Sequence, residues 1–232
     1  MKNISVQSLQ NLSQNDVEME NSGVDYIENI PKNWKMIKGK FIFAQRNQRG
    51  NNIELQLLSP TQKYGVIPQN LYEEISGYNA VKLNEKTDYS LLKTIHKGDY
   101  CISLRSFQGG FEYYQYEGVV SPAYQVFYAV KKIFEGYYKY LFKAQIFINK
   151  MNSFTMSLRD GKNIAFKDFG NTLIPVPPIE EQQQIAEFLD VKCAEISSVI
   201  LEKKQQIDAI EEYKKSLIFE YVTGKKEVNF DE

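Results

Sequence analysis

Side chains that commonly perform catalysis are scarce in this sequence. His96 is the only histidine, so neither a histidine-based metal site nor a relay between two imidazoles is available. Cys101 and Cys193 stand far apart without metal-ligand spacing, and we expect both to remain thiols. Acidic pairs such as Glu73 with Glu74 are adjacent in sequence and typical of solvated faces. The composition favours a protein that has no catalysis of its own, no metal and no cofactor.

Sequence signatures of nucleotide binding and methyl transfer are also missing. "TGKKE" at 223–227 lacks the glycine spacing of a P-loop, and no GxGxxG occurs. Amino-methylating enzymes carry Asn or Asp before Pro-Pro-aromatic, whereas Pro177 and Pro178 are preceded by Val176 and followed by Ile179. We therefore do not expect an enzyme.

Polar and basic side chains of the types that contact DNA gather in three short segments. Arg, Lys, Asn, Gln and Ser supply the donors and acceptors that bind phosphates and base edges. The segments read "QRNQRGNN", "SLRSFQGG" and "SFTMSLRDGKN", and each contains glycine, as loops often do. The candidate DNA-binding residues in them are Arg46, Arg49, Asn51, Arg105, Ser106, Gln108, Ser157, Arg159, Lys162 and Asn163. Because any single member can be exposed without touching DNA, the prediction concerns the set, and above all the second and third segments.

The charges of the chain are divided between two regions. Residues 24–176 hold twenty basic and thirteen acidic side chains, whereas residues 177–232 hold seven basic and thirteen acidic ones. The overall charge of −1 therefore hides a basic middle and an acidic end. We expect two surfaces with different partners, of which the basic one suits DNA.

The elements that must position the polar segments form an α+β globule. Short β-branched or aromatic runs bounded by Gly, Pro and Ser predict strands at 53–59, 99–106, 111–118 and 124–130. Apolar residues at helical intervals predict a helix between 134 and 151. The tyrosines at 113, 114 and 116 could stack on bases, although strand tyrosines more often pack in a sheet.

A single long helix follows the globule. From Ile179 onward apolar residues recur at heptad positions, and neither Gly nor Pro appears before Gly224, which predicts about 44 helical residues spanning about 66 Å. Pro178 and the glutamates after it suit a helix start, and Gly224 suits its end. The predicted dimerisation residues of this coiled-coil helix are Leu189, Cys193, Ile196, Ile200, Lys203, Ile207, Ile210 and Leu217. Lys203 and Lys214, both at heptad core positions, would fix the register or reach water from the seam.

The predicted organisation has four parts. Residues 1–23 are a polar leader, 24–176 the globule, 177–224 the spacer and dimerisation helix, and 225–232 a tail. No apolar run is long enough to cross a membrane and the N-terminus is unlike a signal peptide, so we expect a cytoplasmic protein.

Three stretches of the sequence resemble one known family in the same order. They are "SGVDYIENIPKNW", "KGDYCISLRS" with "GVVSPAYQVF", and "GKNIAFKDFGNTLIPVPPIEEQQQIAEFLD". Together they are similar to the specificity (S) subunit of type I restriction-modification systems. "DYIEN" departs from the Trp-Ile-Gly step that the family tends to have. Members typically carry two target recognition domains, each followed by a long helix, and the helices pack antiparallel.

The resemblance implies a half-size S subunit with one target recognition domain and one spacer helix. Its implied partners are double-stranded DNA, methyltransferase (modification) subunits, the restriction subunit and a second copy of itself. S-adenosylmethionine and ATP would belong to those partners. Other hypotheses remain open: a non-catalytic coiled-coil assembly protein without DNA specificity, a half subunit that pairs with a different half subunit, or a truncated, silent or recombining gene copy.

Overall fold

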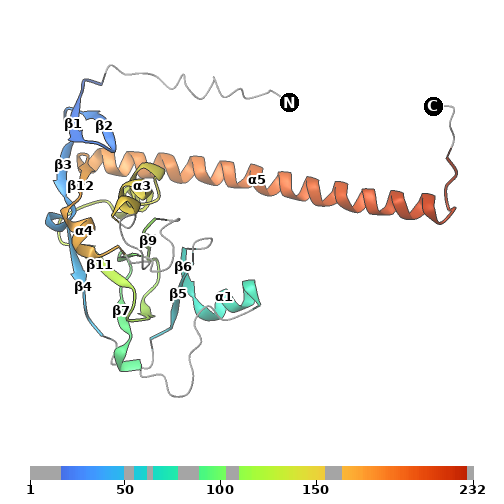
Figure 1. Cartoon of the computed structure of the whole chain (residues 1–232), viewed down its shortest axis with the longest axis horizontal. Coiled ribbons are helices and arrows are strands. Elements are labelled where there is room, and N and C mark those ends of the chain that lie inside the picture. The colour runs from blue at the N-terminus through green and yellow to red at the C-terminus, as the bar shows by residue number, and fades with distance from the viewer. Residues whose placement is uncertain are drawn as a thin grey trace. The chain divides into compact units, whose positions relative to one another are not determined.

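The computed structural model describes residues 17–49, 55–61, 65–77, 89–102, 110–154 and 164–228 (Figure 1). The chain divides into two compact units, residues 1–183 and 184–232. The first unit contains strands and short helices, and the second consists mainly of the long helix α5 (Ile179–Val222), whose first turn belongs to the first unit. The predicted fold class, an α+β globule followed by one long helix, is confirmed.

An antiparallel four-stranded sheet organises the first unit. Its order is β4-β11-β8-β9, with bounds Phe43–Arg46 for β4, Gln125–Ala129 for β11, Tyr100–Ile102 for β8 and Glu112–Tyr113 for β9. Across β11 and β8, Val126 pairs with Cys101 and Phe127 pairs with Tyr100. Since side chains alternate along a strand, Val126 and Cys101 share one face of the sheet, and Phe127 and Tyr100 share the other.

Aromatic side chains pack on the Phe127 face. This layer also draws on three helices, which are α2 (Glu135–Leu141), α3 (Gln145–Ser153) and α4 (Phe166–Asn171). The ring centroids of Phe127 and Phe169 lie 4.9 Å apart, and those of Phe43 and Tyr138 lie 5.3 Å apart. The fully buried aromatic residues of the layer are Phe43, Tyr100, Phe111, Phe127, Tyr138, Phe142, Phe147 and Phe169. Such rings bury large apolar areas, and their edge-to-face contacts add to the stability of the unit.

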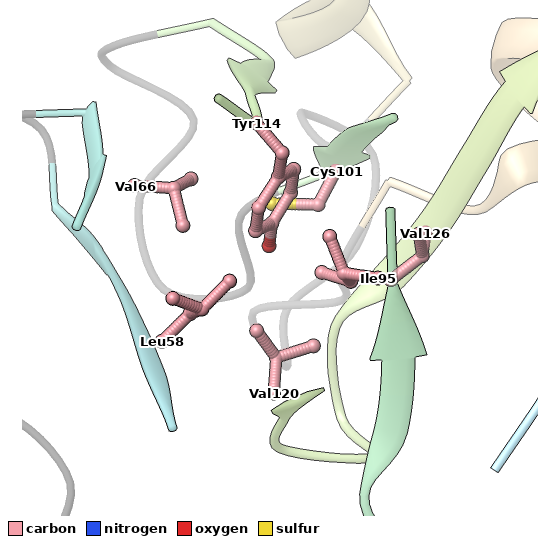
Figure 2. Close-up of a cluster of buried hydrophobic side chains, with 7 residues drawn as sticks. All are labelled: Leu58, Val66, Ile95, Cys101, Tyr114, Val120 and Val126. Atoms are coloured by element: carbon pink, nitrogen blue, oxygen red, sulfur yellow. The ribbon is translucent and has the colours of Figure 1, made fainter. Parts of the chain in front are cut away.

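Smaller side chains fill the Val126 face. They come from the hairpin of β5 (Leu58–Thr61) with β6 (Gly65–Pro68), and from the pair β7 (Lys93–Ile95) with β10 (Gly118–Val120). Figure 2 shows this cluster, in which Tyr114 and Cys101 lie side by side. Its buried members are Leu58, Val66, Ile95, Cys101, Tyr114, Val120 and Val126. The sheet is thus covered on both faces.

The predicted helix between 134 and 151 is two helices. α2 ends at Leu141 and α3 begins at Gln145. Phe142 is fully buried, and its carbonyl accepts a hydrogen bond from the N–H of Phe111 at 3.3 Å. Helical periodicity alone could not predict this break, because the partner of Phe142 comes from a distant part of the chain.

The predicted boundary of the leader at residue 23 was too late. β1 (Met19–Val24) forms an antiparallel hairpin with β2 (Ile27–Pro31), and the Ser22 hydroxyl donates to the carbonyl of Ile27. Residues 1–16 lie outside the described part of the chain. The polar composition of β1 concealed it in the sequence, since a hairpin ladder is held by backbone groups that every residue possesses.

The segment just before α5 is a strand that joins the first unit to the helix. β12 (Leu173–Val176) pairs with β3 (Lys35–Lys38). Pro178 comes immediately before the first residue of α5, and its carbonyl accepts from the N–H of Gln182 at 2.9 Å. Gln182 is 2% exposed; it accepts from the N–H of Phe134 at 2.9 Å and donates to the carbonyl of Pro177 at 2.8 Å. These hydrogen bonds hold the first turn of α5 within the first unit.

Helix α5 has the predicted extent of 44 residues, and both of its ends have specific contacts. In the first turn, Glu181 accepts hydrogen bonds from the indole N–H of Trp34 at 2.7 Å and from the side chain of Asn33. At the other end Gly224 has φ of +71°, and the N–H of Lys225 donates to the carbonyl of Glu220 at 2.8 Å. This is the Schellman arrangement, in which glycine stops a helix.

The remaining elements are short. α1 (Gln69–Ser76) follows β6, and two 3-10 turns are η2 (Gly39–Phe41) and η3 (Tyr89–Leu91). Over the residues described, no helix is both long and apolar enough to span a bilayer.

Candidate nucleic-acid interface

The three polar segments meet the described core at one end of the four-stranded sheet. Arg46, in the first segment, pairs with Val126 across β4 and β11. Ile102, the residue just before the second segment, pairs with Gln125. Ile164, the first described residue after the third segment, accepts a hydrogen bond at 2.8 Å from Nε2 of Gln125. One described anchor point of each segment therefore lies beside Gln125 or Val126.

Gln125 holds the chain on both sides of Ala165. Its Nε2 donates to the carbonyl of Ile164, and its Oε1 accepts from the N–H of Phe166 at 2.7 Å. The residue is half-buried, where each unmade hydrogen bond would carry a desolvation cost. Sequence reasoning did not select Gln125, and its only sign there was its place within "GVVSPAYQVF".

Most of the predicted DNA-binding residues are not among those the structure describes. The ones that lie outside the described residues are Asn51, Arg105, Ser106, Gln108, Ser157, Arg159, Lys162 and Asn163. Arg46 and Arg49 are described, and they differ sharply in environment.

Arg46 is part of the folded framework. Its Nε and Nη2 donate to the two carboxylate oxygens of Asp99 at 2.7 and 2.9 Å. Its guanidinium carbon lies 4.2 Å from the ring centroid of Tyr128, and Asp99 also accepts from the N–H of His96 at 3.0 Å. The Asp99 side chain is only 3% exposed. A bidentate, stacked arginine with a buried partner connects β4 to the loop before β8.

Arg49 is exposed and lies beside a second cation. It forms an isolated antiparallel bridge with Lys93, whose Nζ donates to the carbonyl of Tyr124 at 2.7 Å. The pKa of Lys93 is lowered, first by burial and then by the positive charge of Arg49. No ion pair of Arg49 or Lys93 with a described acidic side chain is present. Positive charge therefore accumulates next to Gln125, where a phosphate group would be attracted.

The three tyrosines near 113 have separate environments. Tyr114 is fully buried, Tyr113 is half-buried, and Tyr116 is 38% exposed. Tyr113 and Tyr116 border a cavity of about 250 Å³, together with Glu112 and Lys143. Nζ of Lys143 lies 2.6 Å from Oε1 of Glu112, and burial raises the pKa of Glu112 although the ammonium group opposes this.

Groups of acidic, thiol or imidazole side chains that would hold a metal ion do not occur within the described ranges.

The predicted dimerisation residues all lie on α5. Leu189 and Leu217 are half-buried, and the exposed ones are Cys193, Ile196, Ile200, Lys203, Ile207 and Ile210.

Comparison with known proteins decides the family. Residues 31–212 match the family described as the type I restriction modification DNA specificity domain. The chain belongs to this family. The match includes the four-stranded sheet, the Gln125 anchor and most of α5. No curated protein sequence matches the chain.

Solved structures show how this specificity domain folds elsewhere. One of these structures comes from a study of complex assembly and conformational transition of the type I R-M system. Its TM-score is 0.58 at 14% identity, and the match covers 87% of this chain and 48% of that one. It has the same fold. The HsdS subunit from Thermoanaerobacter tengcongensis gives a TM-score of 0.46 at 16% identity, over 79% of this chain and 42% of that one. The type I S subunit from M. genitalium gives 0.42 at 16%, over 72% and 41%. The chain spans about half the length of these structures.

Proposed function

We propose that this chain is the DNA sequence-recognition subunit of a type I restriction-modification system and has no catalytic activity of its own. The observation that carries the proposal is that Arg46, Ile102 and Ile164, which lie in or next to the three polar segments, meet around Gln125 and Val126 at one end of the sheet. Loops held by a rigid sheet end suit base reading, because base contacts need fixed donors and acceptors. The neighbouring Arg49 and Lys93 supply positive charge for the DNA backbone.

The base-reading side chains in this proposal come from the second and third segments. Arg105, Ser106 and Gln108 are the candidates of the second, and Ser157, Arg159, Lys162 and Asn163 those of the third. Arg46 supports the framework through Asp99, so Arg49 and Asn51 remain the candidates of the first segment. Membership of the specificity-domain family supports DNA recognition by this domain.

The proposed assembly contains two copies of the chain. Each copy contributes one target recognition domain, and the apolar positions of α5 pair with those of the second copy. A two-fold axis would give a palindromic target in two parts, separated by an unread spacer. The acidic outer surface of the helices would receive the methyltransferase subunits, and the restriction subunit would join that complex.

The experiment that tests the function uses cells that express the chain with its neighbouring methyltransferase. Single-molecule sequencing then maps methylated motifs across the genome, with a strain that lacks the chain as control. We expect a palindromic two-part motif that disappears in the control. An asymmetric motif would indicate pairing with a different half subunit, and absence of any motif would overturn the specificity function.

The salt dependence of DNA binding distinguishes the proposed function from its rival, a coiled-coil assembly protein. A DNA reader that contacts several phosphates loses affinity steeply as salt rises, whereas an assembly protein shows no such dependence. A flat salt response of DNA binding by the methyltransferase complex would favour the rival.

A further inference from the structure

Helix α5 exposes apolar side chains at heptad positions along most of its length. Ile196, Ile200, Ile207 and Ile210 are between 49% and 66% exposed in the single chain. Before Leu189 the heptad core positions are already covered, since Ala186 has no exposed surface and Gln182 is 2% exposed. At these positions a pairing surface is therefore available only from Leu189 onward.

The lysines of this surface decide the direction of the partner helix. A parallel, in-register pair would place Lys203 against Lys203 of the second copy, and Lys214 against Lys214 of the second copy, inside the seam. Two buried like-charge contacts oppose that arrangement. The a positions are Cys193, Ile200, Ile207 and Lys214, and the d positions are Leu189, Ile196, Lys203, Ile210 and Leu217. In an antiparallel pair each a position faces a d position, so neither lysine meets the same lysine of the second copy. The antiparallel direction is therefore favoured by the sequence of α5 itself.

Several antiparallel registers keep the a and d positions facing one another, and in three of them Cys193 faces Lys203, Ile210 or Leu217 of the second copy. In the first register Cys193 faces Lys203 of the second copy. This would bring Ile210 of the second copy against Ala186, which is already buried in the single chain. The first register therefore uses the exposed positions only between Leu189 and Ile207, and it leaves the end of α5 unpaired.

The second register, with Cys193 facing Ile210 of the second copy, places like charges together. Asp190 would lie beside Glu211 of the second copy, and the two-fold axis repeats this repulsion. It would also set Val199 against the polar Gln206. The second register thus has both an electrostatic and an apolar mismatch.

The third register, with Cys193 facing Leu217 of the second copy, satisfies both criteria. Lys192 lies beside Glu220 of the second copy, twice by symmetry. Val199 and Tyr213, which are 52% and 67% exposed, cover each other. Lys204 of one copy lies near Lys204 of the second copy at the two-fold axis. Both occupy flanking positions, where their ammonium groups reach water.

We infer that α5 pairs antiparallel with α5 of a second copy in the register that sets Cys193 opposite Leu217, with the two-fold axis at Gln205. The inference rests on the homodimer of the proposed function and specifies its contact surface. Leu189 of one copy then faces Tyr221 of the other, which separates the two Leu189 residues by about 48 Å along the rod.

Cysteine cross-linking of the full chain tests the register, because Cys193 is exposed and natural. Cys101 is fully buried and burial raises its pKa to about 12, so it should stay reduced in the folded protein. The variants Leu217→Cys, Ile210→Cys and Lys203→Cys each add the partner that one register requires. Sedimentation velocity establishes the dimer first, and copper–phenanthroline then oxidises adjacent thiols.

We expect a covalent dimer for Leu217→Cys and none for the other two variants. The wild type should not cross-link, because a Cys193–Cys193 bond requires a parallel pair. Adding Cys193→Ser to Leu217→Cys is the matched control and should abolish the bond. Cross-linking of Ile210→Cys or Lys203→Cys in place of Leu217→Cys would overturn the register, as would a wild-type cross-link. A monomer in sedimentation would instead contradict the homodimer of the proposed function.

Discussion

Gln125 and Phe166 are joined by a hydrogen bond of 2.7 Å from the backbone N–H of Phe166 to the Gln125 side chain. The two residues are 41 positions apart, and between them lies the third polar segment. Gln125 also pairs through its backbone with Ile102, the residue just before the second segment. One side chain and its strand thus tie together the supports of two proposed reading segments.

Replacing Gln125 by Ala should therefore impair recognition more than folding. The variant loses two hydrogen bonds, each worth about 1 kcal/mol, and leaves the Ile164 carbonyl and the Phe166 N–H to bind water. We expect a modest fall in the free energy of unfolding and a large loss of methylation at the native motif. The exposed Gln145 is the matched control, and Gln145→Ala should retain both properties. Unchanged methylation by Gln125→Ala would show that this anchor does not position the reading segments.

Arg46 and Arg49 should give opposite results when each is replaced by Ala. Arg46→Ala leaves the buried Asp99 carboxylate without its partner, which should lower the free energy of unfolding by about 3 kcal/mol. Arg49→Ala removes an exposed cation, so stability should hold. Its DNA binding should weaken at all sequences alike, with a salt slope reduced by about 1. Denaturant titration and salt-dependent binding measure the two effects, and a stable Arg46→Ala protein would refute the framework role.

Glu112 should make the protein less stable as pH rises above the ordinary carboxyl range. Burial raises its pKa above the ordinary value of 4.5, so the folded state keeps this proton at pH values where the unfolded state has lost it. Stability from this group is present below pH 4.5 and falls as pH rises toward the raised pKa, with a slope of at most about 1.4 kcal/mol per pH unit.

Glu112→Gln tests this dependence, because the amide cannot titrate. The wild type should lose stability relative to the variant as pH rises from 4.5 toward the raised pKa, as measured by denaturant unfolding at each pH. Glu73→Gln, at an exposed position, should follow the wild type throughout. A wild type that gains stability over the variant as pH rises would mean that Lys143 outweighs burial.

Removing one heptad from α5 should shorten the spacer of the recognised motif. Deletion of residues 202–208 keeps the phase of the apolar positions and shortens the helix by about 10 Å. At about 3.4 Å per base pair, the two halves of the motif should move closer by about three base pairs. Motif mapping with the methyltransferase measures this, and deletion of four residues, which breaks the phase, serves as the comparison. An unchanged spacer would separate target geometry from helix length.

The sequence by itself determined the features that depend on local order. Helix α5 was predicted from its apolar period and from the distance between Pro178 and Gly224, and the structure has it at Ile179–Val222. Several strand cores were predicted for the same reason, since β11 lies within 124–130 and β8 within 99–106. Such elements can be predicted because the spacing of apolar residues along the chain indicates both the type of element and the side that faces the core.

Only the tertiary structure decided which distant residues meet. The Arg46–Asp99 pair joins residues 53 positions apart and gives Arg46 a contact inside the folded unit that the sequence did not predict. The break at Phe142 depends on Phe111, and the anchoring by Gln125 depends on strand order. Strand order and buried pairing follow from the packing of the whole unit. Backbone donors and acceptors are alike in nearly every residue, so they do not specify which strands pair.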